Sequence, residues 1–161
     1  MKNVLFLCTG NSARSLIAEG ILRHRGAGHY GSFSAGSQPT GKPNKGAIAV
    51  LEAHGIDTSF AASKSWDVFS GKDAWTMDII ITVCANAAGE TCPIWPGHPT
   101  SAHWGVEDPA AVTTPDEAVT AAFAKTYDEM SRRIDAFLAL DESDDSIDML
   151  AALRAIGQID D

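Results

Sequence analysis

Cysteine is scarce in this sequence, since its 161 residues include only Cys8, Cys84 and Cys92. A small and odd number of cysteines argues against the disulfide framework of a secreted domain. The stretch before the first motif, residues 1–7, is too short for a signal peptide. We therefore expect a cytoplasmic protein with reduced thiols, in which each thiol serves packing, metal binding or chemistry.

Basic residues are also few, with 12 Lys and Arg against 21 Asp and Glu, which gives a formal net charge of −9. A nucleic-acid-binding protein needs a basic stripe that displaces counterions, and the sequence has none. The same charge disfavours binding to an anionic membrane surface. No apolar run approaches the roughly 20 residues of a membrane span. The sequence therefore predicts neither a nucleic-acid partner nor a membrane partner.

Apolar residues make up 45% of the chain, enough for the core of one globular domain. The continuous apolar run at 4–7 is typical of a parallel strand buried on both faces, the segment DIIITV at 78–83 is another buried strand, and 32–35 is a shorter strand candidate. Helical patterns alternate with these strands. One expected helix starts near residue 13, and the others cover 47–54, 114–140 and 147–156. This order predicts an α/β fold with a small parallel sheet of about four strands and helices on both faces.

The start of the last long helix carries a specific signal. Thr114-Pro115-Asp116-Glu117 combines a capping box with proline at the first helical position. After this helix, residues 141–148 are acidic and are expected to form a solvated linker. The sequence thus divides into a domain over 1–140 and an acidic C-terminal extension over 141–161 that holds a short helix.

The first candidate site follows the first expected strand and reads Cys8-Thr9-Gly10-Asn11-Ser12-Ala13-Arg14-Ser15. Loop amides and a helix N-terminus attract an anion, and Gly10 and Asn11 tolerate the left-handed conformations that such a loop requires. Arg14 can clamp two oxygens of a tetrahedral oxyanion. The same field should lower the pKa of Cys8, and Ser15 can donate to its thiolate. A merely buried cysteine is the alternative for Cys8 alone, but the whole pattern indicates a nucleophile beneath a phosphate-like oxyanion.

A family resemblance is carried by the run VLFLCTGNSARSLIAEG at residues 4–20. It resembles the low-molecular-weight tyrosine phosphatase superfamily and, more closely, the arsenate reductases related to these phosphatases. The likeness covers roughly residues 2–140 and implies a phosphatase-like catalytic domain. It implies that Cys8 is the nucleophile and Arg14 the oxyanion clamp, while Asn11 and Ser15 shape the loop and stabilise the thiolate. Many relatives carry a second cysteine where this chain has Ala13.

A candidate proton donor lies in the string His103-Trp104-Gly105-Val106-Glu107-Asp108-Pro109-Ala110. Asp-Pro alone more often just starts a turn. The longer string, however, is similar to the acid loop of arsenate reductases, which implies that Asp108 is the general acid. The phosphatases usually continue with aromatic residues that flank a phosphotyrosine ring, whereas this chain continues with Ala110 and Ala111.

Cys84 and Cys92 bracket seven small or polar residues. Cys84 follows a buried strand, so structural burial is one interpretation. A loop rich in glycine and proline is expected to run from Cys84 to about Pro109. A zinc site with His98 and His103 is another, but structural zinc pairs usually have two to four residues between cysteines. The string from Val83-Cys84 to Cys92-Pro93-Ile94 resembles the resolving loop of thioredoxin-linked arsenate reductases.

This resemblance implies a three-thiol relay in which Cys8 attacks arsenate, Cys84 attacks the Cys8 sulfur, and Cys92 then attacks Cys84. The electrons come from the cysteines, so no organic cofactor and no metal are expected, and the partner is an external thiol reductant of the thioredoxin type. Glutaredoxin and small thiols remain open as reductants. The rival functions are hydrolysis of phosphomonoesters, which needs neither Cys84 nor Cys92, and a non-catalytic oxyanion or redox sensor.

Three further features concern the surroundings of the loop at residues 8–15. Glu19 lies on the first helix, where it either orients the loop or is a solvated charge. Ser34-Ala35-Gly36 resembles a family segment that packs behind the anion loop. Some relatives hold a monovalent cation through an acidic residue after the next helix, but Ser63-Lys64-Ser65 lacks that acid, so no cation is predicted.

Overall fold

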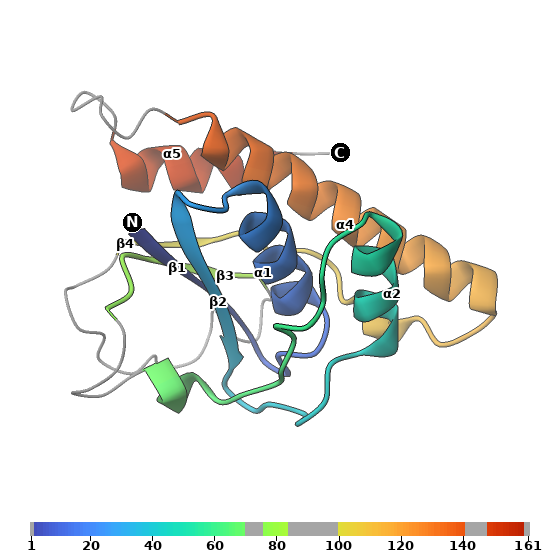
Figure 1. The fold of residues 1–161 in the computed structure, drawn as a ribbon. Coiled ribbons are helices and arrows are strands. Elements are labelled where there is room, and N and C mark those ends of the chain that lie inside the picture. Colours follow the sequence, from blue (N-terminus) through green and yellow to red (C-terminus); the bar gives the residue numbers. More distant parts are fainter. Residues whose placement is uncertain (1, 70–75, 84–99, 141–147, 160–161) are drawn as a thin grey trace.

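The computed structural model describes residues 2–69, 76–83, 100–140 and 148–159. Within them one sheet of four parallel strands has the order β2-β1-β3-β4 (Figure 1). The strands are β1 (Lys2–Cys8), β2 (Tyr30–Gly36), β3 (Ile79–Thr82) and β4 (Thr100–His103). Residues 4–7 of the inner strand β1 are fully buried, as expected for a parallel strand that is covered on both faces.

The described helices are α1 (Arg14–Arg25), α2 (Lys45–Ala53), α4 (Asp116–Leu138) and α5 (Met149–Ile156), with short 3-10 helices η1 (Trp66–Phe69) and η2 (Pro109–Ala111). Helices α1, α2 and α4 pack together over one face of the sheet (Figure 1). A smaller apolar cluster, which includes Leu5, Met77, Ile80 and Phe69 of η1, lies on the other face. The predicted α/β class with a four-stranded parallel sheet is therefore confirmed.

Two local predictions are wrong. The loop expected to run from Cys84 to Pro109 is interrupted by β4, whose sequence TSAH has no apolar run and which forms because it pairs with β3. The capping box does not form, because Pro115 itself occupies the N-cap of α4 in an extended conformation and no side chain caps the helix. Thr114 therefore lies one residue too early to act as the N-cap. Asp116 and Glu117 still place negative charge in the first turn, where the helix dipole favours it.

The C-terminal helix α5 packs into the main core. Leu153 and Ile156 are buried with residues of the sheet and of α4. Trp104, which follows β4 and is completely buried, donates its indole N–H to the carbonyl oxygen of Leu153 at 2.9 Å. The expected tail helix over 147–156 is thus observed at Met149–Ile156. The expected linker lies mostly outside the described residues, and the division at residue 140 stays a prediction.

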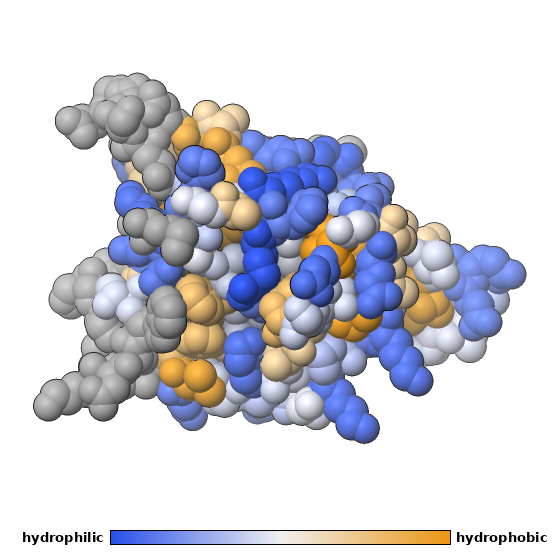
Figure 2. Space-filling view, in the orientation of Figure 1, coloured by the Kyte–Doolittle hydropathy of each residue, from blue (hydrophilic) through white to orange (hydrophobic). Residues whose placement is uncertain are grey.

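The described surface exposes few large hydrophobic side chains. Among the described residues, the large hydrophobic side chains that are exposed are Val68 and Val112. Figure 2 shows that hydrophobic residues on the drawn face form separate patches among hydrophilic ones. Within the described part of the chain, no helix is both long enough and apolar enough to cross a membrane.

Candidate active site

The anion loop, residues 8–15, joins the carboxyl end of β1 to the start of α1. In open α/β sheets this edge is where ligands bind. Four backbone N–H groups of the segment 37–44 donate to carbonyl oxygens of the loop: Ser37 to Cys8, Gln38 to Thr9, Thr40 to Gly10 and Asn44 to Ser12. These bonds hold the carbonyl oxygens of residues 8, 9, 10 and 12 on the outer side of the anion loop. The loop thereby curves around a central hollow, which we call the cup.

Two groups lie within hydrogen-bond distance of the sulfur of Cys8. The backbone N–H of Asn11 donates to Sγ at 3.2 Å, and the Ser15 hydroxyl oxygen lies 3.0 Å from Sγ. Asn11 makes this possible because it adopts a positive φ of 46°, a conformation that asparagine tolerates better than most residues. Hydrogen bonds to a sulfur favour its thiolate form, so the local geometry suits a nucleophile.

Cys8 lines a pocket of about 340 Å³ together with Arg14, Asp108 and other residues of the loop. The guanidinium Nη2 of Arg14 lies 3.6 Å from Oδ2 of Asp108, and Nη1 donates to the carbonyl oxygen of Val106 at 3.3 Å. Asp108 also caps η2, since its Oδ1 accepts from the N–H of Ala110 at 3.0 Å. The nucleophile, the oxyanion clamp and the proton donor predicted from the sequence are therefore together in one pocket.

Cys84 and Cys92 lie outside the described residues, so their predicted roles stay predictions. The residue before Cys84 is described. Val83 is buried, and its N–H donates at 2.8 Å to the carbonyl oxygen of Leu7, the residue before Cys8. The chain therefore approaches Cys84 along the strand next to β1 and at the level of the anion loop.

Sequence reasoning missed several supports of the loop. The Ser63 hydroxyl donates to the carbonyl oxygen of Gly10 at 3.0 Å, and the backbone N–H of Lys64 donates to Oδ1 of Asn11 at 2.9 Å. Ser34 had only a packing role in the prediction, but its hydroxyl accepts from Nδ2 of Asn11 at 2.9 Å. No local pattern signals these contacts, because each joins segments that are distant in sequence.

Gly36, at the end of β2, leaves room for the anion loop. A Cβ at this position would lie 2.5 Å from the carbonyl oxygen of Thr9 and 3.0 Å from the backbone nitrogen of Asn11. Backbone atoms cannot yield as a flexible side chain can, so Gly36→Ala is expected to displace the loop. The affinity of the Gly36→Ala variant for inorganic phosphate, measured by calorimetry, should fall about tenfold or more.

Gly55→Ala is the matched control for this substitution. Gly55 has a φ of 75° with open space around its Cβ position, so alanine strains the backbone by about 1 kcal/mol but does not touch the loop. The control should lower the thermal midpoint and leave phosphate affinity unchanged. Equal phosphate affinity in Gly36→Ala and the wild type would show that the glycine is not needed for the shape of the cup.

Metal binding has no support among the described residues, where no three His, Cys, Asp or Glu side chains are grouped so as to hold an ion. The zinc alternative depends on Cys84, Cys92 and His98, which lie outside these residues. It is therefore not tested by the structure.

Comparison with known proteins adds to this geometry. The family model for the low molecular weight phosphotyrosine protein phosphatase matches residues 3–147. An arsenate reductase of Bacillus licheniformis is 36% identical over 136 residues, which cover 84% of this chain and 94% of the relative. An arsenate reductase of Bacillus subtilis strain 168 is 35% identical with the same coverage.

Solved structures give the same likeness. An arsenate reductase in the reduced state superposes with a TM-score of 0.67 and 28% identity, covering 86% of this chain and 98% of the other. An arsenate reductase in the phosphate binding state has a TM-score of 0.64 and 29% identity, covering 84% and 98%. The fold thus belongs to a known structural type.

Proposed function

Because the chain belongs to the low molecular weight phosphotyrosine protein phosphatase family, we propose that it is an enzyme that reduces arsenate to arsenite with Cys8 as the nucleophile. The observation that supports this most is the pocket in which the Cys8 sulfur, the Arg14 guanidinium and the Asp108 carboxyl meet. Relatives that are 35–36% identical over most of the chain bear the name arsenate reductase, which favours arsenate as the oxyanion.

In the first step the Cys8 thiolate attacks arsenic, and an As–S bond forms as an arsenate oxygen leaves as water. Arg14 and the loop amides bind the remaining oxygens, and Asp108 supplies the proton to the leaving oxygen. Phosphate and arsenate have nearly the same shape and charge, so the same cup serves either anion.

In the second step the Cys84 thiolate attacks Sγ of Cys8. A Cys8–Cys84 disulfide forms and the S–As bond breaks, and its electron pair stays on arsenic, which is thereby reduced from As(V) to As(III) and leaves as arsenite. Cys92 then attacks Cys84, which frees Cys8 and leaves a Cys84–Cys92 disulfide. An external dithiol of the thioredoxin type reduces this disulfide and completes the cycle.

The described residues support the proximity that this relay needs. Thr82 pairs with Leu7 in the sheet, and the N–H of Val83 donates to the carbonyl oxygen of Leu7. Val83, the residue before Cys84, therefore lies at the carboxyl end of the strands, where Cys8 also lies. Attack of a thiolate on a sulfur requires the two to approach each other.

The direct test is arsenite formation with thioredoxin, thioredoxin reductase and NADPH, in parallel with glutaredoxin and glutathione. We expect steady arsenite production with the thioredoxin system and slower production with the other reductants. If arsenate is reduced with none of these reductants while the pocket still binds phosphate, the proposal is contradicted. That result would favour a non-catalytic oxyanion or redox sensor.

Asp108→Asn tests the proton donor. The amide keeps the shape of the side chain but cannot supply a proton, so the kcat for hydrolysis of an aryl phosphate should fall about 100-fold or more. Phosphate affinity should change only a few-fold, because Arg14 and the loop remain. Glu107→Gln is the matched control, since this neighbouring side chain is 93% exposed and outside the pocket. An unchanged kcat in Asp108→Asn would assign the proton donor elsewhere.

Hydrolysis of phosphomonoesters is the second candidate function, because the pocket holds the three groups that this reaction requires. Ala110 lines the pocket where an aromatic side chain would flank a phosphotyrosine ring. Hydrolysis should therefore be a side activity on small aryl phosphates.

A further inference from the structure

The acid loop, residues 104–108, joins β4 to η2 and ends on Asp108, the candidate proton donor. Nη1 of Arg133, a buried residue of α4, donates to the carbonyl oxygen of Gly105 at 3.1 Å. The N–H of Val106 donates at 3.1 Å to the chain just after β3. The position of Asp108 therefore depends on how the backbone just before it is held.

The start of the acid loop is held by the C-terminal helix α5. The indole N–H of Trp104 donates to the carbonyl oxygen of Leu153 at 2.9 Å, and both side chains are completely buried. The Trp104 ring also packs against Phe137 of α4, with 6.4 Å between the ring centroids. A buried indole needs an acceptor for its N–H, and α5 supplies that acceptor.

Gly157, the residue that follows α5, lets this helix end approach closely. Its φ of −63° and ψ of −15° suit any residue, so the backbone conformation does not require glycine. A Cβ at this position, however, would overlap the carbonyl oxygen of His103 and lie 3.0 Å from Cδ1 of Trp104. The missing side chain thus allows α5 to lie directly against the first residue of the acid loop.

The family match ends at residue 147, before α5 begins at Met149. The reaction described above gives this helix no task. A helix that only covers a core needs apolar side chains, and α5 has these in Leu153 and Ile156. Its hydrogen bond and its close approach are more specific, because both are directed at the residues just before the proton donor.

We propose that α5 anchors the acid loop, so that Trp104 and Gly157 fix the main chain before Asp108 and hold its carboxyl within reach of the leaving oxygen. This rests on the proposed function, in which Asp108 is the proton donor. Trp104 and Gly157 do not line the pocket around Cys8, so they are positioning residues that act through Asp108. A displacement of about 1 Å in a catalytic group can lower a rate about 100-fold.

The first test is hydrogen exchange of the acid loop in Gly157→Ala, read by mass spectrometry of its peptides. The added methyl group must push α5 and the start of the loop apart, so the loop amides should exchange about tenfold faster or more. The peptide that covers the anion loop, residues 8–15, should exchange as in the wild type. This measurement needs no substrate and is independent of the proposed reaction.

The second test compares kcat/KM for phenyl phosphate and para-nitrophenyl phosphate. Phenol is the poorer leaving group, so its ester depends more on a well-placed acid. Gly157→Ala should lower kcat/KM about tenfold or more for phenyl phosphate and about threefold or less for the nitrophenyl ester. Its affinity for inorganic phosphate should stay within about twofold of the wild type, because the anion loop binds the anion.

Asp108→Asn separates this proposal from the proposed function. It should lower the phenyl phosphate rate selectively, and Gly157→Ala should then add little in the Asp108→Asn background. If Asp108→Asn leaves the ratio of the two kcat/KM values unchanged, the assigned proton donor is wrong. In that case, or if the wild type hydrolyses neither ester, the exchange result alone decides whether α5 anchors the loop.

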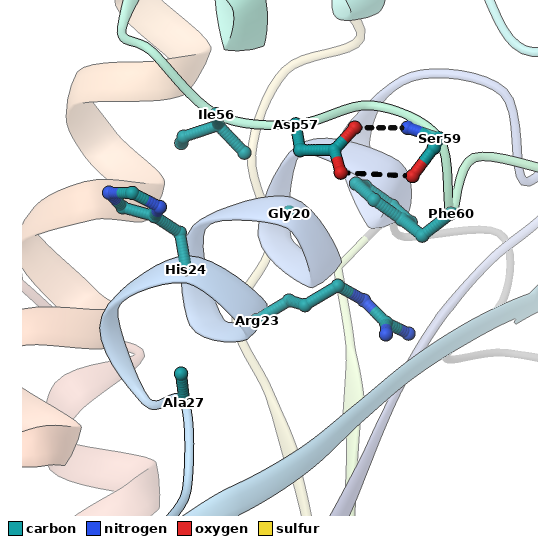
Figure 3. A pocket seen from close by; sticks show the side chains of 8 residues that line it. All are labelled: Gly20, Arg23, His24, Ala27, Ile56, Asp57, Ser59 and Phe60. Atoms are coloured by element: carbon teal, nitrogen blue, oxygen red, sulfur yellow. Dashed lines mark hydrogen bonds between the residues drawn. The ribbon is translucent and has the colours of Figure 1, made fainter.

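Gly20→Ala is the matched control. Gly20 lies on α1 in the wall of a pocket of about 310 Å³, next to Phe60 (Figure 3). A Cβ there would lie 2.9 Å from Cδ1 of Leu51 and 3.1 Å from Cζ of Phe60. This substitution therefore also disturbs close packing, but toward α2 rather than toward the acid loop. It should change neither the exchange of the acid loop nor the ratio of the two kcat/KM values.

Trp104→Phe is the second variant, which decides if circular dichroism shows that Gly157→Ala does not fold. It removes the indole donor to Leu153 and should change exchange and the ratio of the two kcat/KM values in the same direction. Unchanged exchange of the acid loop in these variants would overturn the proposal. Equal losses of kcat/KM for the two esters in Gly157→Ala, with Asp108→Asn selective, would also overturn it.

Discussion

Replacing Cys8 by serine is expected to abolish both arsenate reduction and hydrolysis of aryl phosphates. The Cys8 sulfur is the nucleophile in both reactions, and a serine hydroxyl at the same place has no group beside it that takes its proton efficiently. The loss in kcat should be on the order of 10³-fold or more. Arsenite formation and release of the aryl alcohol measure the two activities on the same protein.

Phosphate affinity separates lost chemistry from a damaged site in this variant. Arg14 and the loop amides remain in Cys8→Ser, and the negative thiolate beneath the anion is gone, so phosphate should bind at least as tightly as in the wild type. Arsenate reduction that survives in Cys8→Ser would show that another thiol attacks arsenic.

Replacing Cys84 by serine is expected to separate the two reactions. Without Cys84 no thiol attacks the Cys8 sulfur, so steady arsenate reduction should fall on the order of 10²-fold or more, whereas hydrolysis of an aryl phosphate should continue. Both rates are measured as for Cys8→Ser. An undiminished steady rate of arsenate reduction in Cys84→Ser would contradict the relay.

Cys92→Ser is the companion variant. It leaves Cys8 and Cys84 in place but removes the thiol that would attack Cys84. We expect it to accumulate the Cys8–Cys84 disulfide after one turnover, whereas Cys84→Ser cannot form it.

The sequence predicted the centre of the site because its signal is local. Cys8 and Arg14 are separated by five residues that span a strand end and a helix start, so the fold of one short segment brings them together. Asp108 is distant in sequence and was identified from a resemblance. Its Oδ2 lies 3.6 Å from Nη2 of Arg14, and its role as the proton donor stays a prediction.

The supports of the site were harder to predict, because they depend on contacts between distant segments. Ser63 and Lys64 reach the loop from the segment after α2 and show no periodic pattern. Helix α1 is buried continuously from Ser15 to Leu22, between the sheet and the other helices, so hydrophobic periodicity could not show on which side Glu19 lies. Strand β4 could not be predicted because its sequence is mostly polar. It forms by pairing with β3, so no apolar run marks it.

Mass mapping of disulfides after a single arsenate turnover, with no external reductant, tests the central claim most directly. We predict one arsenite per protein molecule, a Cys84–Cys92 disulfide and a reduced Cys8. Three reduced thiols with the arsenate unchanged, or arsenite formed without any disulfide, would contradict the account.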